Sequence, residues 1–193
     1  MIKVKSGDIF ESEADALVNP VNSRGVMGKG LAREFRKRFP EYLRAYKYGC
    51  KAKTLKPGKL QLVKLHVDPP IPGQRWPAVI HFPTKGHWKS QSNLKWIRDG
   101  LRELKEKYSS WGLKSVAMPA LGTGLGGLKW EDVKRLIHEV LESEPLIVEV
   151  YLGALHDHGE IVEKPPERKT KPRPRGKTRA KAVNLSLGLG GRT

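Results

Sequence analysis

The chain has almost no cysteine, since Cys50 is the only one among 193 residues. A single thiol cannot form an internal disulfide, which favours a reducing compartment such as the cytoplasm. The surrounding residues 46–53 (YKYGCKAK) supply basic neighbours but no arrangement typical of a catalytic cysteine. The sequence therefore excludes an internally disulfide-bonded fold and does not favour a thiol enzyme.

Long apolar runs are also missing. No stretch approaches the roughly 18 consecutive apolar residues that indicate a membrane-spanning helix. Residues 1–10 (MIKVKSGDIF) lack the basic-then-apolar layout of a signal peptide. We therefore expect no membrane partner. The hydrophobic fraction of 38% suffices for one packed core, and 193 residues fit one domain with an appendage.

Acidic residues are scarce, with 20 Asp and Glu against 37 Lys and Arg, and the net charge is +17. Ten of the basic residues but one acid fall within residues 164–193, a stretch rich in proline and glycine. Such a composition predicts disorder. We expect a folded domain over residues 1–155 and a basic tail over 156–193 that holds nucleic acid loosely. The basic surface of the folded part fits either a polyanionic partner or simple solvation.

Strand and helix patterns alternate along the folded part. Short apolar or alternating runs predict strands over residues 2–10, 16–21, 59–65, 78–82, 115–121 and 146–152. Apolar residues spaced by three or four predict helices near residues 31–46, divided at Pro40, and over 94–108 and 130–141. We expect Ser92 or Asn93 to cap the second of these regions. This order predicts an α/β sandwich around a largely parallel sheet, with ligands at the carboxyl ends of the strands.

A glycine-rich loop follows the predicted strand 16–21. In NSRGVMGKGLA, Gly25, Gly28 and Gly30 let the backbone approach a ligand closely, and free N–H groups of the next helix can meet an anion. The spacing is not that of a Walker loop. The loop is therefore either an anion site or a plain strand-to-helix turn.

A second glycine-rich loop follows the predicted strand 115–121. Gly122, Gly124 and Gly127 in GTGLGGLKW match the G-x-G-x-x-G dinucleotide fingerprint. Only one strand follows, and no acid ends it to hold a ribose, which disfavours a standard NAD site. Two such loops at strand ends favour a cradle for a diphosphate.

Three reactive side chains follow the predicted strand 78–82, which we expect Pro83 to end. Lys85 either neutralises a diphosphate or, with its pKa lowered by burial, acts as a nucleophile toward a sugar carbon. His87 can titrate or cap a turn, and we favour the turn. Trp88 can stack on a nucleobase or pack on the core, and we favour packing.

Near the N-terminus, Asp8 follows a glycine in SGDIF. Its carboxylate can accept a hydrogen bond from an adenine amino group. It can equally form an Asx-turn at the end of the first strand.

Four segments together resemble the macrodomain family, whose members bind ADP-ribose. They are SGDIF (6–10), ALVNPVNSRGVMGKGLAREFRKRFPEYLRAY (16–46), HFPTKGHW (81–88) and MPALGTGLGGLKWEDV (118–133). Within the family they are most similar to the macrodomains of DarG antitoxins, which remove ADP-ribose from thymidine in single-stranded DNA and so undo the action of DarT toxins. The resemblance covers roughly residues 1–152.

The resemblance implies a three-layer α/β/α sandwich with a mixed, largely parallel sheet, and neither a metal nor a cofactor. It implies Lys85 as the catalytic residue and His87 and Trp88 as a possible substrate rim. The implied ADP-ribose-binding residues are Asp8 and Ile9 at the adenine, Asn19, Asn22 at the distal ribose, Gly28, Lys29 and Gly30 in the first loop, Gly122, Thr123, Gly124, Leu125 and Gly126 in the second, and Tyr151 near the adenine.

The resemblance also implies an activity, an ADP-ribosyl glycohydrolase acting on thymidine in single-stranded DNA. Lys85 would attack C1″ of the ring-opened ribose and give a Schiff-base-type adduct that water resolves. The implied partners are ADP-ribosylated single-stranded DNA, a DarT-like toxin, and nucleic acid on the basic tail. The implied processes are DNA repair and toxin–antitoxin control.

Two acids found in other macrodomain hydrolases are missing here. The first loop, VMGKGLA, has no aspartate, and the second has Gly126 and Gly127 where related glutamate-directed enzymes have one. This favours DNA over protein as the substrate. Three alternatives stay open: a non-catalytic ADP-ribose-binding module, a hydrolase of protein-linked ADP-ribose or of ADP-ribose 1″-phosphate, and a nucleic-acid-binding protein with a passive fold.

Overall fold

The computed structural model describes residues 1–64 and 77–153. The elements of these residues are, in chain order, β1 (Ile2–Ser6), the 3-10 helix η1 (Ile9–Glu11), β2 (Ala16–Asn22), α1 (Gly30–Arg38), α2 (Tyr42–Lys51), β3 (Gln61–Val63), β4 (Ala78–Lys85), α3 (Leu94–Lys107), β5 (Ser115–Pro119), α4 (Trp130–Leu141) and β6 (Ile147–Leu152). The predicted basic tail over 156–193 lies outside the described residues.

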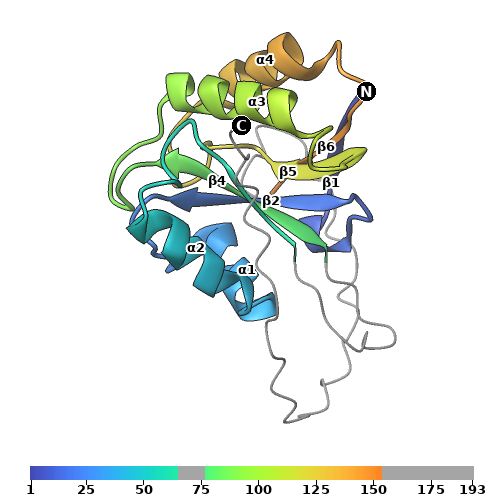
Figure 1. Cartoon of the computed structure of the whole chain (residues 1–193). Coiled ribbons are helices and arrows are strands. Elements are labelled where there is room, and N and C mark those ends of the chain that lie inside the picture. Colours follow the sequence, from blue (N-terminus) through green and yellow to red (C-terminus); the bar gives the residue numbers. More distant parts are fainter. Residues whose placement is uncertain (65–76, 154–193) are drawn as a thin grey trace, which may run out of the picture.

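The strands form one mixed sheet in the order β1-β6-β5-β2-β4-β3. Every neighbouring pair is parallel except β3 with β4. Helices α1 and α2 lie against one face of the sheet, and α3 and α4 lie against the other (Figure 1). The predicted three-layer sandwich with a largely parallel sheet is confirmed.

Alternation along the strands divides the core between the two faces. Along β2, Ala16 and Val18 pack on the α3/α4 side, whereas Leu17 packs on the α1/α2 side. Successive side chains of a strand point to opposite faces, and both faces of this sheet are covered. The cluster on the α3/α4 side is the larger of the two and includes the fully buried Leu101 of α3.

The helices begin and end close to their predicted positions. Pro40 lies between α1 and α2, as expected from its inability to continue a helix. Asn93 rather than Ser92 caps α3, since its side-chain oxygen accepts a hydrogen bond from the Lys95 N–H at 2.8 Å. Within the described ranges, no helix combines the length and apolar character needed to cross a bilayer.

Two predicted strand boundaries were wrong. The first strand ends at Ser6, because Gly7 takes a left-handed conformation (φ +108°) and turns the chain into η1. Pro83 does not end β4, which continues to Lys85. The β3 ladder stops at His81, so Pro83 lies beyond the paired part of that edge, where a missing N–H is tolerated.

Candidate active site

The carboxyl ends of β2 and β4 bring two predicted site residues together. Asn22 ends β2 and Lys85 ends β4, and they are register partners in the parallel pairing, just after a register shift between Val21 and Asn22. The Ser23 N–H donates to the Lys85 carbonyl at 3.1 Å, which continues the pairing beyond β2. An amide and an amine therefore lie at the end of the sheet where ligands of α/β folds bind.

The Asn22 side chain organises the first glycine-rich loop. Its Oδ1 accepts hydrogen bonds from the N–H groups of Arg24 (2.9 Å) and Val26 (3.4 Å), and its Nδ2 donates to the Val26 carbonyl at 2.6 Å. The Tyr46 hydroxyl donates to the Asn22 carbonyl at 2.8 Å and so ties the loop to α2. Asn22 thus shapes the loop, and its contact with a ribose stays a prediction.

The first loop ends where α1 begins. Gly28 and Lys29 are exposed, and Lys29, the N-cap residue, makes no side-chain hydrogen bond to the helix. The N–H groups at the start of α1 can therefore meet an anion. A Cβ atom on Gly30 would lie 3.4 Å from Cδ1 of Leu125, so the first loop borders the second.

The second loop, which follows β5, is folded too tightly to carry a side chain at Gly126. The Ser92 N–H donates to the Gly126 carbonyl at 2.9 Å, and the Thr123 hydroxyl donates to the Ala120 carbonyl at 2.8 Å. A Cβ atom on Gly126 would lie 2.1 Å from the Gly122 carbonyl oxygen. No acid can stand at Gly126 without a change in the backbone, which accounts physically for one of the two missing aspartates.

Lys85 joins the two loops. Its Nζ donates a hydrogen bond to the carbonyl of Leu125 in the second loop. Leu125 and its neighbour Gly124 are both exposed. Burial lowers the pKa of the Lys85 amine below its usual value of 10.5. No carboxylate among the described residues pairs with it. A partly buried amine with a lowered pKa suits a nucleophile, and that role of Lys85 stays a prediction.

Asp8 lies at the end of β1 and is already engaged twice. Its Oδ1 accepts a hydrogen bond from the Phe10 N–H at 3.0 Å and so caps η1, as the Asx-turn interpretation predicted. Its Oδ2 pairs with Arg38 of α1 at 2.8 Å. Sequence reasoning missed Arg38, since nothing local links a helix terminus to a residue 30 positions earlier. An adenine contact of Asp8 stays a prediction.

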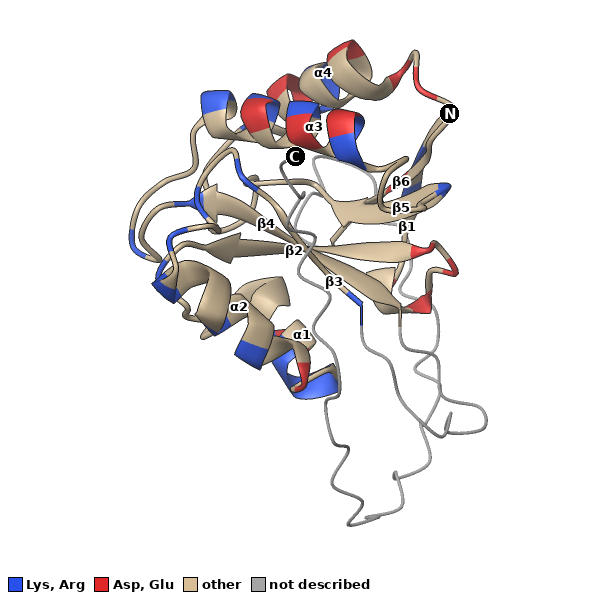
Figure 2. Ribbon diagram, in the orientation of Figure 1, with Lys and Arg blue, Asp and Glu red and all other residues tan. Residues whose placement is uncertain are grey.

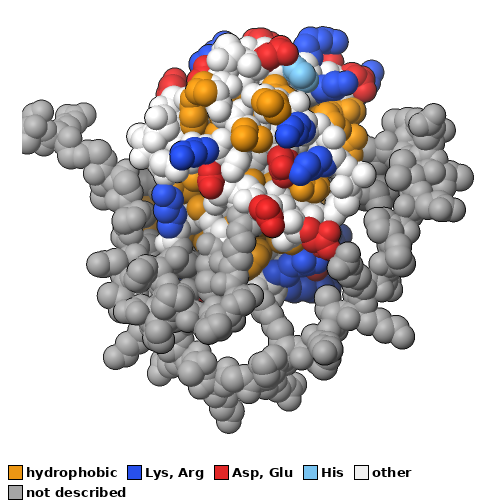
Figure 3. Space-filling view, turned by 90° about the vertical axis from the view of Figure 1, so that its right-hand side faces the viewer, with side chains coloured by type: hydrophobic (Ala, Val, Ile, Leu, Met, Phe, Trp, Pro, Cys, Tyr) orange, Lys and Arg blue, Asp and Glu red, His pale blue; other side chains and the backbone are white. Residues whose placement is uncertain are grey.

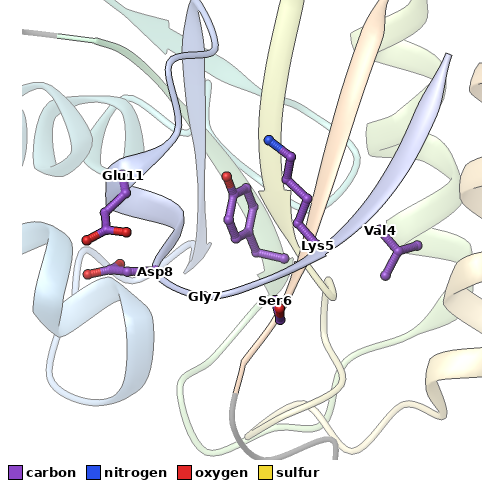
Figure 4. Close-up of a pocket in the computed structure, with 7 residues that line it drawn as sticks. Val4, Lys5, Ser6, Gly7, Asp8 and Glu11 are labelled. Atoms are coloured by element: carbon purple, nitrogen blue, oxygen red, sulfur yellow. The ribbon is translucent and has the colours of Figure 1, made fainter. Parts of the chain in front are cut away.

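A hollow of about 500 Å³ lies beside Asp8 (Figure 4). It is lined by Val4, Lys5, Ser6, Gly7, Asp8, Glu11 and Tyr151. Tyr151 is 7% exposed and packs in the same buried cluster as Ile9. Ile9, Tyr151 and Asp8, the three residues predicted near the adenine, therefore lie at the same end of the site.

A charged pair stands next to this hollow. Lys5 Nζ lies 2.5 Å from Glu149, which also accepts hydrogen bonds from Ser12 at 2.7 Å and from the Tyr151 hydroxyl at 3.2 Å. Burial alone raises the pKa of Glu149, but the bonds from Lys5 and Ser12 outweigh burial and lower it. Glu149 therefore stays ionised and holds the Tyr151 ring in place.

The rim after Lys85 differs from the prediction in one residue. His87 caps a turn as expected, because its Nδ1 accepts a hydrogen bond from the Lys89 N–H at 3.2 Å. Trp88 does not pack on the core: it is 48% exposed and stacks on the His87 ring, with centroids 3.8 Å apart. The prediction of packing was wrong because a turn follows β4 and carries Trp88 out of the sheet layer.

A buried polar layer underlies the first loop. Asn19 is fully buried, with its Nδ2 3.9 Å from the sulfur of Met27 and 3.5 Å from Nδ1 of His81. Burial lowers the pKa of His81 to about 4, so the imidazole is neutral near pH 7. The Tyr46 ring lies 5.2 Å from the imidazole, centroid to centroid. Sequence reasoning missed His81 and Tyr46, although a histidine inside the apolar run AVIHF was a signal.

No group of three or more His, Cys, Asp or Glu side chains in residues 1–64 and 77–153 is placed to hold a metal ion.

Comparison with known proteins places this fold and site in a class. The sequence profile of the macro domain family matches residues 18–137. The chain therefore belongs to the macrodomain family.

Within that family, the chain is similar to DarG proteins. It is 37% identical to the DNA ADP-ribosyl glycohydrolase of Thermus aquaticus, over 97% of this chain and 49% of that protein. The macrodomain of Mycobacterium tuberculosis DarG superposes with a TM-score of 0.70 at 39% identity, over 79% of this chain and 97% of that one. Thermosipho africanus DarTG in complex with ADP-ribose superposes with a TM-score of 0.69 at 37% identity, over 78% of this chain and 41% of that one. The chain spans about half the length of the first of these relatives.

Proposed function

We propose that this protein is a DNA ADP-ribosyl glycohydrolase that releases ADP-ribose from thymidine in single-stranded DNA. The observation that carries the proposal is the position of Lys85, whose backbone is the register partner of Asn22 and whose amine donates a hydrogen bond to the second glycine loop. The names of the relatives support the choice of substrate.

The ADP-ribose moiety would extend along the described elements from one end of the candidate site to the other. The adenine would lie near Ile9 and Tyr151, and the diphosphate between the loop before α1 and the loop after β5. The distal ribose would then reach Lys85. An ion-pairing side chain is not required at the diphosphate, since backbone N–H groups of both loops can hold it.

Lys85 would act as the nucleophile. Once the distal ribose opens, the Lys85 amine adds to C1″. The thymine base then leaves with the electrons of its bond to C1″ and takes up a proton. A C1″=N imine between the ribose and Lys85 remains. Water hydrolyses the imine, which releases ADP-ribose and restores the amine. Only the unprotonated amine reacts, so the rate rises with pH toward an apparent pKa below 10.5, the direction in which burial moves Lys85.

The test compares turnover of a thymidine-ADP-ribosylated single-stranded oligonucleotide by wild type, Lys85→Ala and Lys85→Arg. We expect both variants to lose turnover about 10³-fold or more, while ADP-ribose binding is retained. Arginine keeps the charge but is no nucleophile, so it separates attack from charge neutralisation. Lys134→Ala, an exposed lysine of α4, is the matched control and should turn over normally.

Borohydride gives a second readout, because reduction of the imine would leave ADP-ribose attached to Lys85 in wild type only. Turnover by Lys85→Arg would reject the nucleophile. Tight binding of ADP-ribose without turnover by wild type would reject the enzyme and favour a non-catalytic binding module.

The proposal includes a division of the chain at about residue 155, a DarT-like toxin as partner and the cytoplasm as location. The ten basic residues of the segment 164–193 would hold DNA near the site. Deleting this segment should weaken oligonucleotide binding and leave release of ADP-ribose from a modified mononucleotide unchanged.

A further inference from the structure

The positive charge of the folded part is concentrated in one stretch. Residues 24–59 contain twelve Lys and Arg against two acids, Glu34 and Glu41, whereas residues 60–163 contain thirteen of each sign. All twelve basic side chains are exposed. Blue ribbon segments, which mark Lys and Arg, accordingly gather on α1 and α2, while blue and red segments mix on α3 and α4 (Figure 2).

Most of these cations have no acidic partner among residues 1–64 and 77–153. Three form ion pairs: Lys37 with Glu34, Arg38 with Asp8, and Lys59 with Glu103. The other nine pair with no described residue: Arg24, Lys29, Arg33, Arg36, Arg44, Lys47, Lys51, Lys53 and Lys56. By contrast, acidic and basic side chains alternate on the face at the β1 edge of the sheet (Figure 3).

Helix α2 adds an exposed aromatic ring to this charge. Arg44, Lys47, Tyr48 and Lys51 follow the i, i+3, i+4, i+7 spacing that places residues on one face of a helix. All four are exposed, and the Tyr48 residue is 55% exposed. We refer to these four residues as the α2 strip.

The α2 strip borders the candidate active site. A Cβ atom on Gly25 of the first loop would lie 3.7 Å from Cγ of Lys47. The next contact is Ser23, whose hydroxyl donates to the Gly86 carbonyl at 2.9 Å, directly after Lys85. Helix α2 therefore borders the first loop, and the first loop is bonded through Ser23 to Lys85 at the end of β4 and to Gly86 in the turn that leads to Trp88.

We propose that the α2 strip binds the single-stranded nucleic acid that flanks the modified base. Arg44, Lys47 and Lys51 contact phosphates, and a base stacks on Tyr48. Exposed cations interleaved with an aromatic ring fit a single strand, whose bases are free to stack, better than a duplex. The position of the modified base at Lys85 rests on the proposed function, but the strand-binding surface rests on charge and exposure alone.

The first experiment measures binding of an unmodified single-stranded oligonucleotide to the full chain by fluorescence anisotropy across a salt series. Replacing Arg44, Lys47 and Lys51 together by alanine should make the negative slope of log affinity against log salt shallower by about 2. Each phosphate contact on a single strand contributes about 0.7 to the steepness of that slope. Tyr48→Ala should weaken binding roughly tenfold with little change in slope.

The matched control removes the same charge from the opposite side of the molecule, by alanine at Arg102, Lys114 and Lys134, which are all exposed. We expect a clearly smaller change in slope for this control. Equal losses for the two triple variants would overturn the proposal, because only net charge would then matter. The proposal would also be overturned if wild type bound a duplex as tightly as the single strand. It would likewise be overturned if the α2 triple variant still bound the oligonucleotide but no longer bound anionic lipid vesicles.

The second experiment separates this inference from the proposed function. The α2 triple variant should raise KM for an ADP-ribosylated oligonucleotide about tenfold or more and leave kcat/KM for an ADP-ribosylated mononucleotide unchanged. Unchanged KM for the oligonucleotide would overturn the inference alone. If wild type turned over neither substrate, the proposed function would fail, while anisotropy would still decide whether the strip binds DNA.

Discussion

The helical layers on the two faces of the sheet differ in their charge. Helices α1 and α2 carry seven basic residues and one acid, whereas α3 and α4 carry seven basic residues and six acids. On α3 and α4 most of the cations pair with acids, for example Lys95 with Asp99 at 2.6 Å and Lys107 with Glu103 at 2.7 Å.

The difference separates two uses of surface charge. Paired charges on α3 and α4 solvate and orient helices that cover the larger core. Unpaired cations on α1 and α2 repel one another, which opposes the compact state, and a bound polyanion relieves that repulsion. The α1/α2 side therefore bears charge suited to binding, and the α3/α4 side bears charge suited to stability.

The largest effect should come from the core under α3. Leu101 is fully buried there, and Leu101→Ala should cost about 4 kcal/mol of unfolding free energy in urea. Leu43→Ala on α2 is the matched control and should cost less, because Leu43 is only partly buried. An equal or greater loss at Leu43 would break the comparison.

Acid should destabilise the polar layer on the α2 side of the sheet. His81 is neutral in the folded state with a pKa of about 4, but takes a proton near 6.5 when unfolded. The contribution of His81 to the unfolding free energy therefore falls as pH drops below about 6.5 and levels off below about 4. The total loss from this group is about 3 kcal/mol. His81→Gln should lack this part of the loss, measured by denaturation between about pH 7 and pH 4. Parallel profiles for both proteins would place the acid sensitivity elsewhere.

Gly126→Ala tests the loop that joins Lys85 to the sheet. Because a Cβ there meets the Gly122 carbonyl oxygen at 2.1 Å, we expect about 2 kcal/mol of destabilisation and loss of turnover. Gly124→Ala meets nothing within 4 Å and should leave the melting temperature unchanged. A shift of similar size in both variants would mean that the loop is not held by its own backbone.

A paired charge on α3 should contribute modestly. The Glu103 carboxylate is 4% exposed, accepts a hydrogen bond from the Leu60 N–H and pairs with Lys107. Glu103→Gln keeps the shape but loses the charge, and should cost about 1 kcal/mol. The loss should shrink in high salt, and a loss independent of salt would assign the role to packing instead.

The smallest change in stability should come from the α2 strip. Alanine at Arg44, Lys47 and Lys51 removes exposed side chains without ion partners among the described residues, so the unfolding free energy should change by less than about 0.5 kcal/mol. A slight gain at low salt would agree with relief of repulsion. A loss of several kcal/mol would give these cations a structural role and remove the contrast between the two sides.

Much of the fold was predictable because the spacing of apolar residues along the chain indicates which face of each helix or strand is buried. The apolar spacing of three or four residues located α3 and α4, and Pro40 marked the break between α1 and α2. One prediction failed where a distant element decides the outcome, since Pro83 stays within β4 because β3 stops pairing at His81. Two others failed at local turns, since Gly7 ends β1 early and the chain turns after Lys85 and leaves Trp88 exposed.

The site was predictable as a set of loops but not as a set of contacts. Glycine spacing and Lys85 were visible in the sequence. The engagement of Asp8 by Arg38, the buried Asn19–His81 contact and the role of Asn22 within its own loop were not. The Asp8–Arg38 and Asn19–His81 contacts join residues far apart in the chain, which no short window of sequence encodes. The bonds of Asn22 are local, but they depend on the exact path of the loop backbone, which residue types alone do not specify.

The sequence by itself determined the order of strands and helices, the apolar faces that form the core and the concentration of positive charge in residues 24–59. Only the tertiary structure decided that Asn22 and Lys85 are neighbours, that the Lys85 amine is bonded to the Leu125 carbonyl, and that α2 borders the loop beside them. The physical reason is that periodicity indicates which side of an element is buried. Strand order and register arise instead from pairing between distant segments when the whole sheet forms.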